Sequence, residues 1–159
     1  MTTRRLAALV EYSQPVLYSH FDGKDAIVSA VAIQGFADLA VRLRQAQSAV
    51  DGPRLALRAV CVAYLAFATE RPALYEAMFV LPLDVAFASD DTPSPLKAAF
   101  AELVDVMKPF DTLPDLRAEV TWATLHGLAV LCRGGRIRPK HQEARIDLLI
   151  SQIVNDRGG

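Results

Sequence analysis

The stretch SQPVLYSHFDGKDAI, residues 13–27, contains two helix starts in close succession. Ser13 is a typical N-terminal cap, and the proline that follows it closely is favoured in the first turn of a helix. Asp22 is a second cap, and it opens a longer apolar pattern. The short helix between the caps carries Tyr18 and His20, and we expect these polar aromatic groups to face outward.

A first short helix is expected over residues 2–11, directly before the second one. Two short helices joined by a tight turn are typical of a helix-turn-helix, whose second helix enters the major groove of DNA. The outward polar groups of that helix would reach base edges and phosphates. Lys24 follows at the start of the next helix, where free backbone amides also favour anions, and it is the best candidate phosphate contact.

The rest of the chain predicts an all-α fold, because apolar residues recur at three- and four-residue spacing and strand signals are nearly absent. A long helix over about 23–49 would connect the first segment to the remainder. Further helices are expected over about 53–70, 72–80, 94–108 and 114–133, followed by a last helix from about residue 140. The stretch 83–95 has the composition of a loop.

The composition fits one domain of 159 residues with an unusually apolar interior. Hydrophobic residues make up 52% of the chain and charged residues 22%, which favours an interior cavity or a large subunit interface. The formal net charge is −1, so any contact with nucleic acid must use a local patch. We expect a cytoplasmic protein without a signal sequence, in which Cys61 and Cys132 are buried thiols.

The opening stretch closely resembles the recognition helix of TetR-type transcriptional regulators. Their pattern is Ser or Thr, three variable residues, Leu-Tyr, one variable residue, His-Phe, then Lys and an acidic residue, and residues 13–25 match it in register. The stretch TTRRLAALVEYS, residues 2–13, is similar to the preceding family helix, where a threonine near the start meets a phosphate. The candidate DNA contacts are therefore Thr3, Ser13, Gln14, Pro15, Val16, Tyr18, Ser19, His20 and Lys24.

The far end of the chain also resembles this family. WATLHGLAVL, residues 122–131, looks like the Trp-x-x-x-His-Gly signature of one subfamily of its ligand-binding domains, and RPALYEAMF, residues 71–79, looks like the middle helices. The resemblance implies a pocket lined by Phe67, Met78, Phe79, Trp122 and His126. Because residues 59–68 and 120–131 carry almost no charge, we expect a small hydrophobic or aromatic effector. The alternative is that Trp122 and His126 are ordinary core residues.

The last two helices carry apolar faces with two possible uses. In related regulators these helices pair with their twofold mates in a four-helix bundle, which implies a homodimer. The alternative is that the faces complete the core of the protomer. The candidate interface residues are Leu128, Leu131, Ile146, Leu149, Ile150 and Ile153.

Two features depart from the family pattern. The further helix that precedes the threonine in the family has no counterpart here, because Thr3 lies too close to the start of the sequence. Glu11 occupies the turn position that usually holds glycine, which would cost about 1 kcal/mol if that residue needs a positive φ. We therefore expect a truncated helix-turn-helix segment over 1–22, a connecting helix over 23–49 and an effector-binding and dimerisation domain over 50–157.

The resemblance implies a ligand-responsive, homodimeric transcriptional regulator that acts as a repressor on double-stranded operator DNA. An enzyme is not expected, since Ser13, His20 and Asp22 are local cap and helix residues without an oxyanion loop. Neither a cofactor nor a metal is implied, because the three histidines lack metal-binding spacing. The alternative function is a dimeric small-molecule-binding protein of the same ancestry that no longer binds DNA.

Overall fold

The structure is a computed structural model that describes residues 23–81 and 89–156, and every regular element in these ranges is helical. The all-α prediction is therefore confirmed. The expected helix-turn-helix segment and residues 83–88 of the expected loop lie outside the described residues. The elements are α3 (Gly23–Ser48), α4 (Pro53–Glu70), α5 (Pro72–Phe79), α6 (Ser94–Met107), α7 (Pro114–Arg133), a 3₁₀ turn (Pro139–His141) and α8 (Gln142–Asn155).

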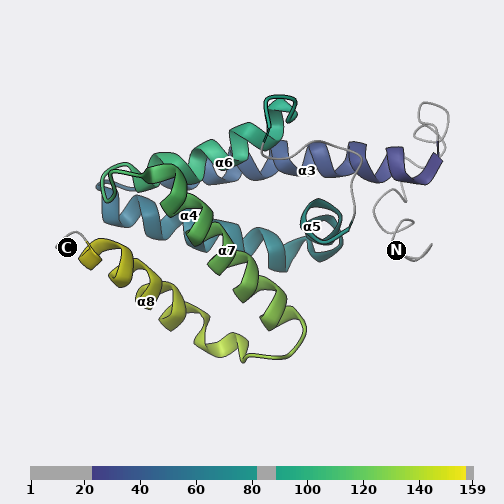
Figure 1. Cartoon of the computed structure of the whole chain (residues 1–159). Coiled ribbons are helices and arrows are strands. Elements are labelled where there is room, and N and C mark those ends of the chain that lie inside the picture. Colours follow the sequence, from purple (N-terminus) through teal and green to yellow (C-terminus); the bar gives the residue numbers. More distant parts are fainter. Residues whose placement is uncertain (1–22, 82–88, 157–159) are drawn as a thin grey trace.

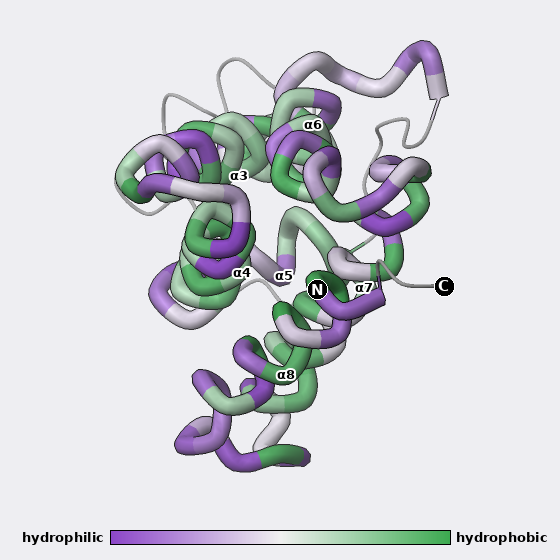
Figure 2. Tube along the Cα trace, turned by 90° about the vertical axis from the view of Figure 1, so that its left-hand side faces the viewer, coloured by the Kyte–Doolittle hydropathy of each residue, from purple (hydrophilic) through white to green (hydrophobic). Residues whose placement is uncertain are grey.

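Helix α4 is the centre of the bundle, because it contacts α3, α5, α6, α7 and α8 (Figure 1). Its apolar residues recur on one side at helical spacing, and Leu57, Val60 and Tyr64 are almost completely buried. Figure 2 looks along the bundle and shows α6 and α8 at opposite edges of the molecule. The core thus has α4 on its inside, flanked on one side by α3 and α6 and on the other by α8.

Helix α3 is long and apolar enough to cross a membrane by length and composition alone. Half of that apolar window is buried within the protein, and α4, α5 and α6 all pack against the helix. Gly35 lets α5 approach closely, since a Cβ built there would lie 2.6 Å from Sδ of Met78 and 2.8 Å from Cδ1 of Leu74. The apolarity of α3 is therefore used in packing against other helices of the chain.

Glycine marks the ends of two helices. Gly52 has a φ of 96°, a conformation that other residues rarely adopt, and it turns the chain from α3 into α4 ahead of Pro53. At the end of α7, Gly135 has a φ of 69°, and the amide of Arg136 donates to the carbonyl of Leu131 at 2.8 Å. This is a Schellman ending, which satisfies carbonyls left open at the helix terminus.

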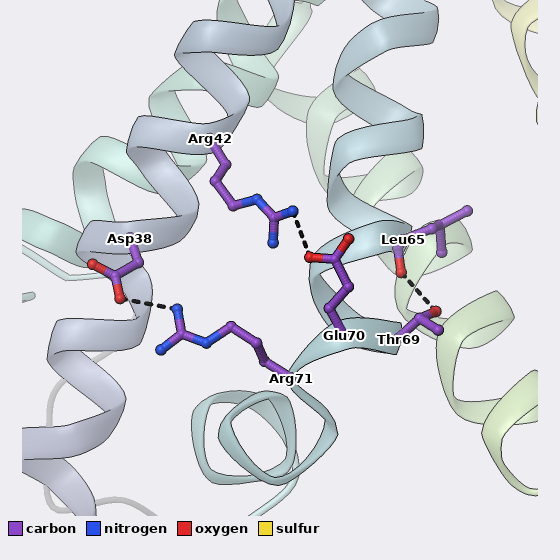
Figure 3. A network of polar contacts seen from close by, with 6 residues as sticks. All are labelled: Asp38, Arg42, Leu65, Thr69, Glu70 and Arg71. Atoms are coloured by element: carbon purple, nitrogen blue, oxygen red, sulfur yellow. Dashed lines mark hydrogen bonds and ion pairs between the residues drawn. The ribbon is translucent and has the colours of Figure 1, made fainter.

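Polar contacts fix α3 against its neighbours. Arg71 donates to Asp38 at 3.0 Å and Arg42 donates to Glu70 at 2.7 Å, which ties α3 to the junction of α4 and α5 (Figure 3). The guanidinium groups of Arg42 and Arg71 also lie 5.7 and 5.4 Å from the ring centre of Phe67.

Farther along α3, the buried carboxylate of Glu102 from α6 accepts hydrogen bonds from Arg44, at 2.9 Å, and from Gln47. A buried carboxylate needs such partners, because an unpaired one would be costly to remove from water. The pairing fixes α6 against α3.

Candidate effector-binding cavity

Four side chains from three helices form one chain of hydrogen bonds. Nε1 of Trp122 donates to Oη of Tyr64 at 3.0 Å, Oη of Tyr64 lies 2.8 Å from Oη of Tyr75, and Oη of Tyr75 lies 2.6 Å from Nδ1 of His126. Trp122 and His126 are one helical turn apart on α7, while Tyr64 and Tyr75 lie on α4 and α5. The Trp-x-x-x-His spacing therefore places the first and the last residue of the hydrogen-bond chain on α7. Through Tyr64 and Tyr75, the hydrogen bonds join α7 to α4 and α5.

The donors in this chain can be assigned from its tryptophan end. Indole N–H can only donate, so Tyr64 accepts there and is free to donate to Tyr75, which in turn donates to Nδ1 of His126. Each hydroxyl then accepts once and donates once, an arrangement in which the bonds strengthen one another. Burial lowers the pKa of His126, which favours the neutral ring that this assignment requires, with the proton on Nε2.

Burial also keeps the two hydroxyls in their neutral form. It raises the pKa of Tyr64 and of Tyr75 well above the ordinary tyrosine range, so neither hydroxyl ionises near neutral pH. The chain is therefore a set of neutral groups that satisfy one another. It offers no charged acid or base for catalysis.

Phe79 is the centre of an aromatic cluster that covers this chain. Its ring centre lies 4.6 Å from that of Tyr75, 5.0 Å from that of Phe36, 5.8 Å from that of Trp122 and 5.9 Å from that of His126. The edge-to-face and tilted geometries are those that aromatic pairs prefer. The cluster brings together helices α3, α5 and α7.

A cavity of about 760 Å³ lies beside the cluster, between α3, α4, α6 and α7. This volume is within the range of pockets that hold small molecules. Its inner wall is made of aromatic and aliphatic side chains, namely Phe36, Leu39, Leu43, Tyr64, Phe79, Leu96, Ala99, Phe100, Leu103 and Trp122.

The solvent-exposed part of the cavity lining has a different character. Four charged side chains line it and are exposed to solvent, and we call them the charged rim: Asp90, Lys97, Asp115 and Glu119. Ser89 and Thr92 complete this side. The cavity is thus apolar inside and charged at its opening.

The predicted ligand-binding residues divide into two sets. Phe79 and Trp122 line the cavity. Phe67, Met78 and His126 are not among its lining residues: Phe67 contacts two guanidinium groups, Met78 packs beside Gly35, and His126 ends the hydrogen-bond chain. The ligand role of these residues stays a prediction.

Sequence reasoning missed the two tyrosines that Trp122 and His126 contact, although each is a polar aromatic on an otherwise apolar helix face. It also missed the aromatic wall from α3 and α6, which is formed by Phe36 and Phe100. The signal available for the tyrosines was the need of a buried hydroxyl for a partner. No such signal existed for the phenylalanines, because their positions depend on helix packing.

The predicted dimer residues also divide. Ile146, Ile150 and Ile153 are buried inside the protomer and belong to its core, so they have almost no exposed surface for contact with a partner. Leu128 and Leu149 are partly buried and pack against that core, while Leu131 is exposed. The alternative that part of these faces completes the protomer core holds for the three isoleucines.

An exposed apolar stripe instead follows the outer side of α7. Its members recur at alternating three- and four-residue spacing, and a Cβ built at the glycine among them would meet nothing within 4 Å. We call this set the outer stripe: Leu113, Leu116, Val120, Ala123, Gly127 and Val130.

The remaining predicted residues add little to a site. Among the candidate DNA contacts, Lys24 is exposed in the first turn of α3, and the others lie outside the described residues.

Burial raises the pKa of the Cys61 thiol to about 12, so that thiol stays protonated. Cys132 is only half-buried, contrary to the expectation, because it lies in the last turn of α7 beside Arg145. Residues 23–81 and 89–156 contain no cluster of side chains suited to hold a metal ion.

These features define a class of protein: a helical bundle with an internal apolar cavity, suited to bind a small molecule. Residues 57–153 match the family described as tetracyclin repressor-like, C-terminal domain. The chain belongs to this TetR-like family. No curated protein matches it in sequence.

Two solved structures share the fold. A protein of unknown function from Rhodococcus sp. RHA1 is similar with a TM-score of 0.72 and 22% identity, over 94% of this chain and 93% of that one. A candidate regulatory protein, SCO4313, is similar with a TM-score of 0.67 and 22% identity, over 94% of this chain and 84% of that one. At this identity the likeness concerns the arrangement of the helices.

Proposed function

We propose that this protein is a ligand-responsive transcriptional regulator that represses its target genes as a homodimer in the cytoplasm. The observation that carries the proposal is the cavity of about 760 Å³ whose wall includes Phe36, Leu39 and Leu43 of α3. The same helix leads back to the sequence that resembles a TetR recognition helix, residues 13–25. An effector in the cavity would therefore contact the helix that carries the DNA-binding segment.

Regulation by this route requires unequal binding to two states. The effector shifts the protein toward the state it binds better, and only by the difference between its two affinities. A displacement of α3 in each protomer changes the distance between two recognition helices, which must match half-sites about 34–36 Å apart. Within the family, we place the chain in the Trp-x-x-x-His-Gly subfamily, on the support of the hydrogen-bond chain from Trp122 to His126.

DNA binding tests the regulator proposal directly. Fluorescence anisotropy should show selective binding of the full chain to DNA from its own upstream intergenic region over scrambled DNA, with weaker binding at higher salt. Tyr18→Ala should abolish the selectivity, while Val41→Ala, on an exposed side chain of α3, should retain it. A dimer that shows no selectivity for that DNA would refute the regulator and favour the alternative, a small-molecule-binding protein of the same ancestry.

The dimer is proposed to form through the outer stripe together with Leu131, rather than through the buried isoleucines of α8. Val120 is 63% exposed near the middle of the stripe, so a charge there would not disturb the protomer but would be buried in the dimer. Val120→Asp should convert a dimer into a monomer in light scattering after gel filtration. Val41→Asp, at a valine that is 51% exposed on α3, is the matched control and should leave the dimer intact.

A further inference from the structure

We propose that the cavity takes a lipophilic organic cation, with its apolar body inside and its positive group at the charged rim. The inference rests on the proposed function, because it names the chemical class of the effector. The sequence predicts only a hydrophobic or aromatic effector, and the inference adds a positive charge to it. It follows from the hydrogen bonds and charges of the polar groups around the cavity.

The interior of the cavity offers a ligand apolar surface and aromatic ring faces. Tyr64 and Trp122 line the wall, but the indole N–H of Trp122 donates to Tyr64, and the hydroxyl of Tyr64 continues to Tyr75. In the described part of the chain, no buried side-chain nitrogen or oxygen lacks a hydrogen-bond partner. A polar group placed deep in the cavity would therefore lose its water without a protein group in need of it.

The charged rim is acidic. It holds the carboxylates of Asp90, Asp115 and Glu119 against the single ammonium of Lys97, and Lys97 already donates to the backbone carbonyl of Asp90 at 2.9 Å. None of the three carboxylates forms an ion pair with another described residue. With three carboxylates and one ammonium, the rim thus has a negative net charge at the opening of the apolar cavity, and Lys108 offsets part of it through its electrostatic interaction with Asp115.

A cation with an apolar body fits both ends of this site. Its charge is attracted by the carboxylates, and it can also rest against the electron-rich faces of Trp122, Phe79 or Phe100. An anion of the same shape would meet an excess of negative charge at the rim, which disfavours it. A neutral compound could fill the interior but would gain nothing from the carboxylates.

Three matched probes test the inference by isothermal titration calorimetry at low salt. They are a phenylbutyl trimethylammonium ion, its neutral carbon analogue with a tert-butyl head group, and phenylpentanoate. Because the carboxylates are exposed, we expect the cation to bind about three- to tenfold more tightly than the neutral analogue, and the anion to bind most weakly. Higher salt should reduce the preference.

A double variant locates the effect at the rim. Asp115→Asn with Glu119→Gln should bring the cation to about the affinity of the neutral analogue and leave the neutral analogue unchanged. The matched control is Glu143→Gln with Asp51→Asn, which removes two exposed carboxylates away from the cavity, one of them also in the first turn of a helix. This control should keep the preference for the cation.

The outcomes separate the inference from the proposed function. Equal or tighter binding of the neutral or anionic probe would overturn the preference for a cation and leave the cavity as an effector site. If none of the three probes binds at millimolar concentration, the cavity is not a site for such compounds and the inference fails. Operator binding by the unliganded protein is unaffected by these results, so the DNA titration still decides the regulator proposal.

Discussion

The inner and outer faces of α7 are both apolar, but they have different surroundings. The inner face buries Thr121 and Leu125 and holds Trp122 and His126 in the hydrogen-bond chain. The outer stripe is exposed and, within the described residues, packs on nothing at Gly127. Hydrophobicity alone thus cannot tell a core face from an exposed face. The face that also satisfies buried polar groups is the one that belongs to the protomer.

The largest effect is expected from truncating one leucine on the inner face. Leu125 has no exposed surface, so Leu125→Ala should lower the free energy of unfolding by about 2–5 kcal/mol, through lost burial and the cavity left behind. Val120→Ala on the outer stripe should change it by less than about 0.5 kcal/mol in the protomer. Urea unfolding at protein concentrations below the dissociation constant of the proposed dimer measures both. Equal losses would mean that the two faces are equally buried in the protomer.

A smaller effect is expected from the hydrogen-bond chain. Tyr75→Phe removes a hydroxyl that bridges Tyr64 and His126 and leaves a buried donor and an acceptor without partners. The loss should be roughly 1–3 kcal/mol of unfolding free energy. Thr124→Val removes an exposed hydroxyl from α7, whose hydrogen bond to the carbonyl of Val120 has water as a substitute, and it should cost less. A negligible loss for Tyr75→Phe would show that the chain does not stabilise the bundle.

Local sequence signals predicted the helices but not which residues line the cavity. The caps, prolines and the Gly134–Gly135 pair act within a few residues, so the ends of α4 and α7 could be placed closely from the sequence. The last helix was expected a few residues early, because the turn Pro139–His141 precedes it.

The charge of the cavity could not be predicted in the same way. The apolar segments 59–68 and 120–131 indicated a neutral pocket, whereas Asp115 and Glu119 lie just before the second of them on the same helix and reach the opening. Their position at the rim depends on how α7 packs against α4 and α6, which is a property of the tertiary structure. The same holds for Ile146, Ile150 and Ile153, whose spacing fits a core and an interface equally well.

The pH dependence of the free energy of unfolding tests the role of His126 on the inner face of α7. Burial lowers the pKa of His126 in the folded state, so the unfolded chain binds its proton more readily. The stabilising contribution of the neutral ring is complete above the unfolded-state pKa of about 6.5 and is lost as the pH falls below it.

The physical reason lies in the donor-to-acceptor direction of the hydrogen bonds from Trp122 to His126. A protonated His126 would donate from Nδ1 and reverse the hydrogen bonds, which would leave the hydroxyl proton of Tyr64 without a partner. Unfolding free energies measured from about pH 7 down to about pH 5 should therefore fall less steeply for His126→Gln than for the parent protein. An identical slope in both proteins would show that this histidine is not held neutral by the fold.

The smallest effect compares two glycines inside helices. Gly127→Ala should stabilise the protomer by roughly 0.5–1 kcal/mol, because alanine favours the helix and the added methyl group meets nothing. Gly35→Ala makes the same gain, but its methyl group would displace the buried side chains of Met78 and Leu74, so a net loss is expected. Thermal unfolding of dilute protein should give opposite signs for the two variants. At higher concentration, Gly127→Ala should also weaken the proposed dimer, since the close approach of two α7 helices along the outer stripe would leave little room for the methyl group. A stabilised protomer with an unchanged dimer dissociation constant would move the proposed contact away from Gly127.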